Sequence, residues 1–213
     1  INAPKLTSEQ SEIHQALIES VGSNITLKYP KNGEYRSAYV IANIDDEPTD
    51  EAMVFYEYTS NGSEEDGLRV NILDKDEDGK WYSVKELAGA GTDIDQVIIS
   101  PMGSNNQTDV FVGYQNLTND EKTMEIYSYT DGDFKRVALD TYSVLEPLDI
   151  NNDGYIELIT IQRSTNNDTG AVTAKASMLN MKNNEITRGE NVDMCDNVTS
   201  YVSSKTGMLD SGR

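Results

Sequence analysis

The sequence contains one cysteine and one histidine among its 213 residues. Cys195 therefore has no partner for an internal disulfide, and it lacks the second cysteine or clustered histidines that a zinc site needs. His14 falls inside a predicted helix, so Ser/His/Asp or Cys/His catalysis would have to depend on that single ring. We expect a passive role for Cys195 and a surface or packing role for His14.

Long apolar runs and basic residues are also scarce. No stretch approaches the roughly 20 consecutive apolar residues of a transmembrane helix. Lys and Arg number 17 against 37 Asp and Glu, so the formal net charge is −20, and the acidic residues are spread along the chain. A field of this sign repels nucleic acid and anionic membrane surfaces, so the sequence predicts neither as a partner. Cations are the natural small ligands.

Residues 1–24 are predicted to form an N-terminal segment with one short helix. Thr7 can cap this helix together with Gln10, which follows three positions later. Gly22 is suited to end it. The apolar residues of the helix recur at helical spacing and form one stripe, which consists of Ile13, Ala16, Leu17 and Val21.

From Ile25 onward the pattern changes to short alternating or apolar runs, which are typical of β-strands. About a dozen such runs follow one another, with no second convincing helix. They span residues 25–29, 37–44, 52–58, 68–73, 80–87, 96–102, 109–115, 124–129, 134–139, 142–150, 156–162 and 176–181. Dipeptides that tolerate positive φ stand between several runs and predict tight antiparallel hairpins: Asn32-Gly33, Asn61-Gly62, Asp78-Gly79 and Asp131-Gly132.

Three acidic residues mark an internal repeat. Glu51, Asp109 and Glu157 each open an apolar strand after a polar loop, at intervals of about 50 residues. Each interval also holds a second hairpin, so a repeat has four strands, which is the unit of a β-propeller blade. We therefore predict an all-β fold of β-propeller-type four-stranded blades over residues 25–213, with about three blades and the start of a fourth.

Three blades and a fraction cannot close a ring that needs 4 to 8 blades. Either the chain is part of a longer protein, or the blades form an open stack whose edges are covered by something else.

The loop of the third repeat carries oxygen side chains at alternate positions. Asp149, Asn151 and Asp153 are followed by Gly154, which permits a sharp turn, by the backbone carbonyl of Tyr155 and by Glu157. Calcium accepts six to eight oxygen ligands in a flexible shell, so this spacing predicts a calcium site. It is not an EF-hand, because Thr160 stands where the bidentate glutamate is needed and a strand follows. The alternative is a metal-free loop closed by Asn and Asp hydrogen bonds to its own backbone.

Other acidic stretches match this pattern less well. The corresponding loops at 45–51 and 103–109 are shorter and lack the full ligand set, so we expect hydrogen bonds alone to hold them. Asp74, Asp76 and Asp78 match the opening positions of the pattern, but Tyr82 occupies the ninth. This stretch is predicted to be a hairpin turn.

The segment DINNDGYIEL, residues 149–158, resembles the FG-GAP and VCBS type of propeller repeat, in full only in this third copy. Residues 4–57 resemble the opening of bacterial surface lipoproteins with such repeats, and the resemblance extends over almost the whole chain. It implies a leader with a lipidated cysteine upstream of Ile1, a location on the outside of the cell and further blades. It implies no catalytic residues.

We expect a non-catalytic, extracytoplasmic binding or scaffold module, lipid-anchored at the cell surface, with one structural calcium loop and an unknown surface protein or glycan as partner. The alternative is a glycan-active propeller enzyme that uses a carboxylate pair. Neighbouring acids such as Asp45 and Asp46 or Glu64 and Glu65 point to different sides of the chain, so no pair can be nominated. Trp81 and the strand tyrosines are predicted to pack in the core.

Overall fold

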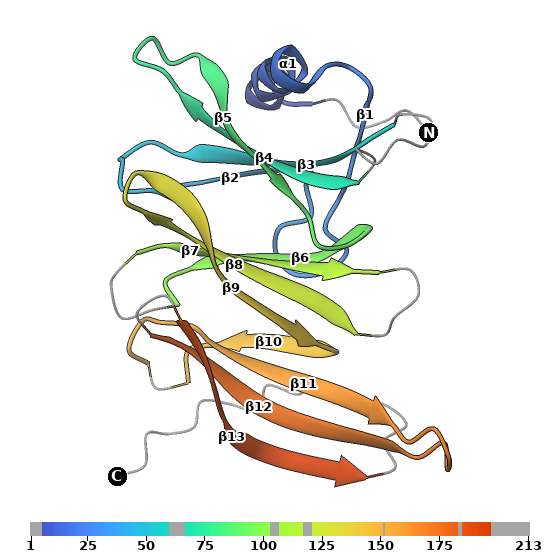
Figure 1. Ribbon diagram of the computed structural model, residues 1–213. Coiled ribbons are helices and arrows are strands. Elements are labelled where there is room, and N and C mark those ends of the chain that lie inside the picture. The colour runs from blue at the N-terminus through green and yellow to red at the C-terminus, as the bar shows by residue number, and fades with distance from the viewer. Residues whose placement is uncertain are drawn as a thin grey trace.

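The computed structural model describes residues 6–59, 67–102, 107–116, 121–150, 152–182 and 185–196. The fold is all-β with one short N-terminal helix, as the sequence predicts. The strands form three antiparallel sheets that are stacked in chain order, with the helix at one end of the stack (Figure 1).

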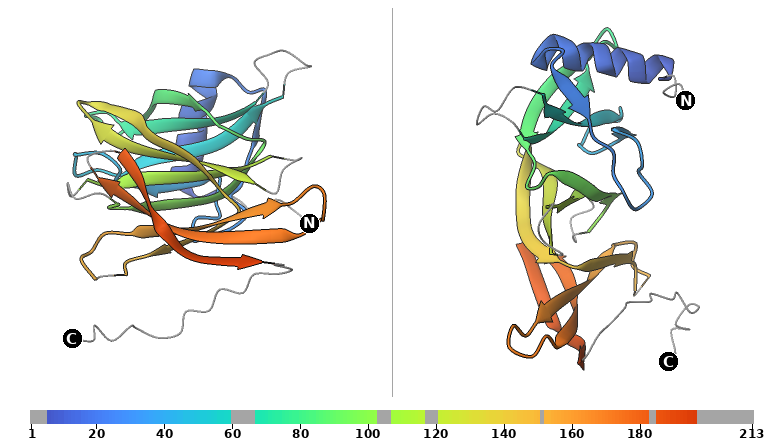
Figure 2. Two further views of the ribbon diagram at one scale, coloured as in Figure 1. Left: turned by 60° about the horizontal axis from the view of Figure 1, so that its bottom comes forward. Right: turned by 90° about the vertical axis from the view of Figure 1, so that its right-hand side faces the viewer.

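The second and third sheets are meanders in which each strand pairs with the next one along the chain. The first contains β1 (Ile25–Leu27), β2 (Tyr39–Ala42), β3 (Glu51–Tyr58), β4 (Leu68–Lys75) and β5 (Trp81–Ala88). The second contains β6 (Asp93–Ser100), β7 (Asp109–Gln115), β8 (Lys122–Thr130) and β9 (Asp133–Tyr142). The third contains β10 (Val144–Leu148), β11 (Glu157–Thr165), β12 (Val172–Lys182) and β13 (Glu185–Asp196). The right-hand view of Figure 2 shows β5, β9 and β13 along the same side of the stack.

The first sheet departs from the four-stranded prediction, because two short strands share one edge of β3. Tyr39 of β2 pairs with Val54, and Ile25 of β1 pairs with Tyr58 farther along the same strand. Each of the twelve strand segments predicted from the sequence overlaps a strand of the structure, although the ends differ by a few residues. β13 is an additional strand, and Cys195 within it pairs through its backbone with Ala174. The predicted start of a fourth blade in 200–213 lies outside the described residues, as do Glu64 and Glu65.

The helix α1 (Ser8–Val21) covers the outer face of the first sheet. Its N-cap is the predicted one, since the Thr7 side chain accepts from the Gln10 N–H and the Gln10 side chain accepts from the Thr7 N–H. Ile13 and Leu17 are buried against the sheet. His14 Nδ1 lies 2.8 Å from the hydroxyl oxygen of Tyr39, where the helix meets β2. Among the described residues, no helix combines the length and apolar character needed to span a bilayer.

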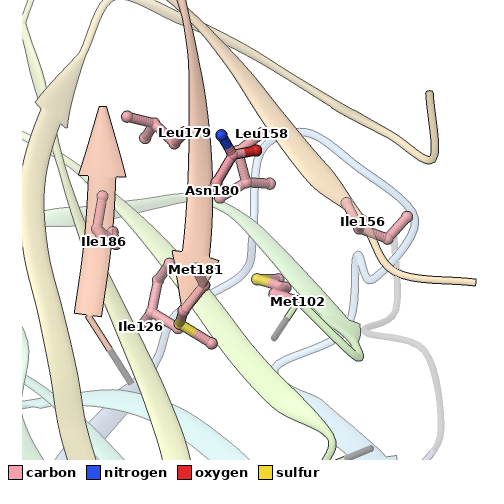
Figure 3. A pocket seen from close by; sticks show the side chains of 8 residues that line it. All are labelled: Met102, Ile126, Ile156, Leu158, Leu179, Asn180, Met181 and Ile186. Atoms are coloured by element: carbon pink, nitrogen blue, oxygen red, sulfur yellow. The ribbon is translucent and has the colours of Figure 1, made fainter. Parts of the chain in front are cut away.

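Apolar side chains fill the spaces between neighbouring sheets. Phe55 and Val70 of the first sheet pack with Val112 and Tyr127 of the second. Between the second and third sheets, Ile126 lies among Leu158 and other apolar side chains (Figure 3). The aromatic residues behave as predicted, because Trp81 and most strand tyrosines, including Tyr56, Tyr114 and Tyr127, are buried. Packing between the apolar faces of neighbouring sheets therefore holds the three sheets together as one stack.

The turn predictions have different outcomes. Asp131-Gly132 joins β8 to β9 with φ of 54° and 73°, and Asp78-Gly79 lies in the turn between β4 and β5. The prediction of a tight hairpin at Asn32-Gly33 is wrong, since β1 and β2 pair with β3 rather than with each other. Asn32 runs beside β6 instead and donates its N–H to the Asp95 carbonyl at 2.7 Å. Asn61-Gly62 lies outside the described residues.

Candidate functional site

The loops β2–β3, β6–β7 and β10–β11 are closed in the same way. In each, the first acid of the second strand accepts the backbone N–H that lies seven residues earlier. The distances are 2.8 Å from Ile44 to Glu51, 3.0 Å from Met102 to Asp109 and 2.9 Å from Ile150 to Glu157. The three acids that mark the sequence repeat therefore occupy one structural position. Their remaining surroundings differ, and these differences decide what each loop can bind.

In the third loop the predicted ligands bind backbone amides. Asp149 accepts from the N–H groups of Asp153, at 3.2 Å, and Gly154, at 3.0 Å, and Asp153 accepts from Tyr155 at 2.9 Å. Gly154 has φ of 90°, which provides the sharp turn expected there. The structure thus brings four of the five predicted residues, including Glu157, into one loop. Asn151 lies outside the described residues.

These hydrogen bonds match the metal-free alternative. A carboxylate has about four lone-pair sites, so an oxygen that accepts one N–H can still approach a cation. Within the part of the chain that the structure describes, no three acidic, histidine or cysteine side chains come together as a metal-binding group. Asn151 and the Tyr155 carbonyl belong to the predicted ligand set but not to that residue class. Calcium therefore stays a prediction for this loop.

In the second loop the acid is fully enclosed. Asp109 has no exposed surface, and its carboxylate accepts from the Ser128 hydroxyl as well as from the Met102 N–H. Hydrogen-bond donors on both oxygens stabilise the buried charge. These two bonds fix Asp109 at the end of the loop, but residues 103–106 lie outside the described residues, so the expectation that hydrogen bonds alone hold the loop stays a prediction.

The acid of the first loop is buried without such support. Glu51 is 3% exposed, and its Oε2 accepts from Ile44 while its Oε1 has no hydrogen-bond partner. The pKa of Glu51 is raised to about 7, chiefly by burial and to a smaller extent by the nearby carboxylates of Asp45 and Asp74, while the Ile44 N–H acts in the opposite direction. Hydrogen bonds do hold this loop, since the Asn43 side chain donates to the Glu47 and Thr49 carbonyls and Asp45 accepts from the Glu47 N–H. They leave Glu51 Oε1 without a partner.

Glu51 lines a cleft of about 180 Å³ between the first and second sheets. The β2–β3 loop and the ends of β4 and β5 form one side, and the β8–β9 turn forms the other. Among the described residues, five acidic side chains but only one basic side chain line it. The acids are Asp45, Glu47, Glu51, Asp74 and Asp133, and the base is Lys85. Three aromatic side chains complete the walls, namely Tyr82, Tyr129 and Phe134.

The negative field of this cleft reaches across the two sheets. Tyr129 belongs to the second sheet, yet after burial the causes that raise its pKa are acids of the first sheet, with Asp46 and Asp45 the largest. Burial also raises the pKa of Asp45, and Asp74 adds to that effect. The carboxylates therefore act on one another and on the aromatic wall, and a cation in the cleft would relieve this repulsion.

Sequence reasoning did not find this cleft. Ala52 pairs with Leu73, so the neighbouring positions Glu51 and Asp74 lie at the same end of two adjacent strands. Tyr129 comes to them from another sheet. Only the strand register and the stacking of sheets bring these residues together, and the one local signal was the acidic run at 45–47.

Comparison with protein-family models, with curated proteins and with solved structures finds no match to this chain. The resemblance to lipoproteins with FG-GAP and VCBS repeats therefore stays a prediction from the sequence.

Proposed function

We propose that this chain is a non-catalytic binding or scaffold module of a bacterial surface protein, held outside the cell by a lipid anchor on a leader upstream of Ile1. The observation that carries the proposal is the set of three loops closed in the same way by Glu51, Asp109 and Glu157 at the start of a strand. Loops fixed on a rigid stack of sheets are a common means of presenting contact residues to a partner. The partner is a surface protein or a glycan.

Calcium has a structural role in this proposal. An ion in the third loop would be held by Asp149, Asn151, Asp153, the Tyr155 carbonyl and Glu157, and it would offset the repulsion among three carboxylates. Because such an ion binds the folded chain and not the unfolded one, it stabilises the fold with the logarithm of its concentration. The alternating oxygen ligands and the sharp turn at Gly154 support this assignment.

One observation favours the enzyme alternative. A buried carboxyl group such as Glu51, whose burial raises its pKa to about 7 in a cleft with other acids, has the properties of a general acid. A glycosidase would need a second carboxylate at a defined separation across the substrate.

A panel of immobilised and soluble glycans, together with envelope protein fractions, separates the two functions. If the chain is a binding module, we expect it to retain one partner saturably and to leave the covalent structure of every glycan unchanged. Release of reducing ends from a glycan, lost in Glu51→Gln, would contradict the proposal and establish the enzyme.

A further inference from the structure

We propose that the cleft between the first and second sheets binds an organic cation, namely an alkyl chain that ends in an ammonium or guanidinium group. This ligand is chemically distinct from a calcium ion in the third loop, and it occupies a different part of the stack.

The first step of the argument is the unbalanced charge of the cleft. Lys85 binds Asp133 at 2.6 Å and the Phe134 carbonyl at 2.8 Å, so this base is already engaged at one side. Among the described residues, no basic side chain lies within 4.0 Å of the carboxylates on the opposite side, which belong to Asp45, Glu47, Glu51 and Asp74. Like charges this close destabilise one another unless a counter-charge is present.

The second step is an unused acceptor at the most buried acid. Glu51 Oε1 has no hydrogen-bond partner, although buried polar atoms in folded proteins are nearly always paired. The other oxygen of the same carboxylate accepts the Ile44 N–H at 2.8 Å, which helps to orient the group. An ammonium or guanidinium donor would satisfy this oxygen with a charge-assisted hydrogen bond.

The third step is the shape and chemistry of the walls. Tyr82 and Tyr129 line the cleft, and aromatic rings attract organic cations by cation–π interaction. Ile44, Ile72 and Val84 add apolar surface for an alkyl stem. A bare metal ion would make no use of these aromatic and apolar groups. The space of about 180 Å³ also exceeds what a bare ion fills.

The test is a titration of the complete chain with n-butylamine, which reproduces the end of a lysine side chain, and with the neutral n-butanol as control. Backbone amide resonances report the position of binding, and calorimetry reports the affinity, at mildly alkaline pH and low salt. We expect saturable shifts at Ile44, Glu51 and Tyr129 with the amine and none with the alcohol.

Two variants test whether the amine binds beside Glu51 and Asp74, and a third variant is a control outside the cleft. Glu51→Gln keeps an acceptor for the Ile44 N–H but removes the charge, and we expect it to weaken amine binding about tenfold or more. Asp74→Asn should weaken binding without touching that hydrogen bond, which covers the case in which Glu51→Gln does not fold. Asp78→Asn makes the same chemical change as Asp74→Asn at an acid that does not line the cleft, and it should leave amine affinity unchanged.

Two further probes distinguish the natural sources of this chemistry. Tighter binding of putrescine than of Nα-acetyl-lysine methylamide identifies a free diamine, and the reverse order identifies a lysine side chain of a partner protein. The proposal is overturned if neither amine gives saturable shifts, or if the shifts persist in both Glu51→Gln and Asp74→Asn. It is also overturned if Ca²⁺ alone binds in the cleft, because the site would then be a metal site.

Discussion

The hydroxyl of Tyr142 donates a 2.6 Å hydrogen bond to the carboxylate of Asp95, and both residues are buried. Asp95 lies in β6 and Tyr142 ends β9, so the bond connects the two outermost strands of the second sheet. Gly113 of β7 makes this contact possible, because a Cβ at that position would overlap the Tyr142 hydroxyl. Lys122 and Asn32 complete the hydrogen bonds to Asp95, each at 2.8 Å.

We predict that Tyr142→Phe lowers the free energy of unfolding by about 1.5–3 kcal/mol, because it removes a donor from a buried carboxylate. Urea unfolding measures the change. Tyr29→Phe is the matched control, since Tyr29 is 56% exposed, and its effect should be within about 0.5 kcal/mol. Equal stabilities of Tyr142→Phe and the unmodified chain would mean that the bond contributes nothing.

The raised pKa of Glu51 predicts a stability that falls as pH rises. The pKa is about 7 in the folded protein and 4.5 for an ordinary glutamate, so between these values the folded chain binds more protons than the unfolded chain. The stabilising contribution is therefore complete below about pH 4.5 and is lost as the pH rises through about 7. Glu51→Gln imitates the protonated form, and at about pH 8 it should stabilise the fold by up to about 3 kcal/mol.

The measurement is urea unfolding of Glu51→Gln and of the unmodified chain over this pH range. We expect the difference between them to fade toward about pH 4.5. Glu157→Gln is the control, because its carboxylate makes the same kind of backbone bond but is more exposed to solvent. A Glu51→Gln chain that is less stable than the unmodified chain at every pH would show that the charged form is well accommodated.

Calcium binding at the third loop predicts a melting temperature that depends on the metal. Adding Ca²⁺ should raise the melting temperature, EGTA should reverse the effect, and Asp153→Ala should abolish it, because Asp153 is a proposed ligand. Asp78→Ala is the control, since Asp78 belongs to the similar acidic stretch in the β4–β5 turn, where Asp76 binds the N–H groups of Asp78 and Lys80. Identical melting curves with Ca²⁺ and with EGTA would leave the loop metal-free.

Because side chains are closely packed between the second and third sheets, a cavity made there should lower the free energy of unfolding. Leu158 is 3% exposed and lies among the side chains of Figure 3, so Leu158→Ala should lower the free energy of unfolding by about 2–5 kcal/mol. Leu139→Ala makes the same chemical change at a site that is 58% exposed and should cost far less. Similar losses for both variants would contradict the stacked arrangement.

The strands and their grouping could be predicted from the sequence because the information is local. Alternation of apolar residues marks each strand, and the spacing of Glu51, Asp109 and Glu157 marks the repeat. Asn32-Gly33 failed as a hairpin because a dipeptide that permits a turn does not determine which strands pair. The backbone hydrogen bonds from Lys31 and Asn32 to β6 connect segments more than 60 positions apart, and no local pattern contains that information.

The two candidate sites also differ in whether local sequence could reveal them. The third loop could be recognised because Asp149, Asp153 and Glu157 are close in sequence. The cleft could not, since Glu51, Asp74 and Tyr129 meet only through strand register and sheet stacking. The repeat alignment also hid a difference, because Asp109 has a serine donor on its second oxygen while Glu51 has none.

The account depends most on the state of the Glu51 carboxyl group, and its titration by carbon NMR of the side-chain carboxyl tests that state directly. We predict a midpoint near pH 7 that moves to lower pH when n-butylamine is added, because the amine stabilises the charged form. A midpoint at the ordinary value of 4.5 that does not move with the amine would contradict the account twice. It would show that burial does not raise the pKa of Glu51, and that no organic cation binds in the cleft.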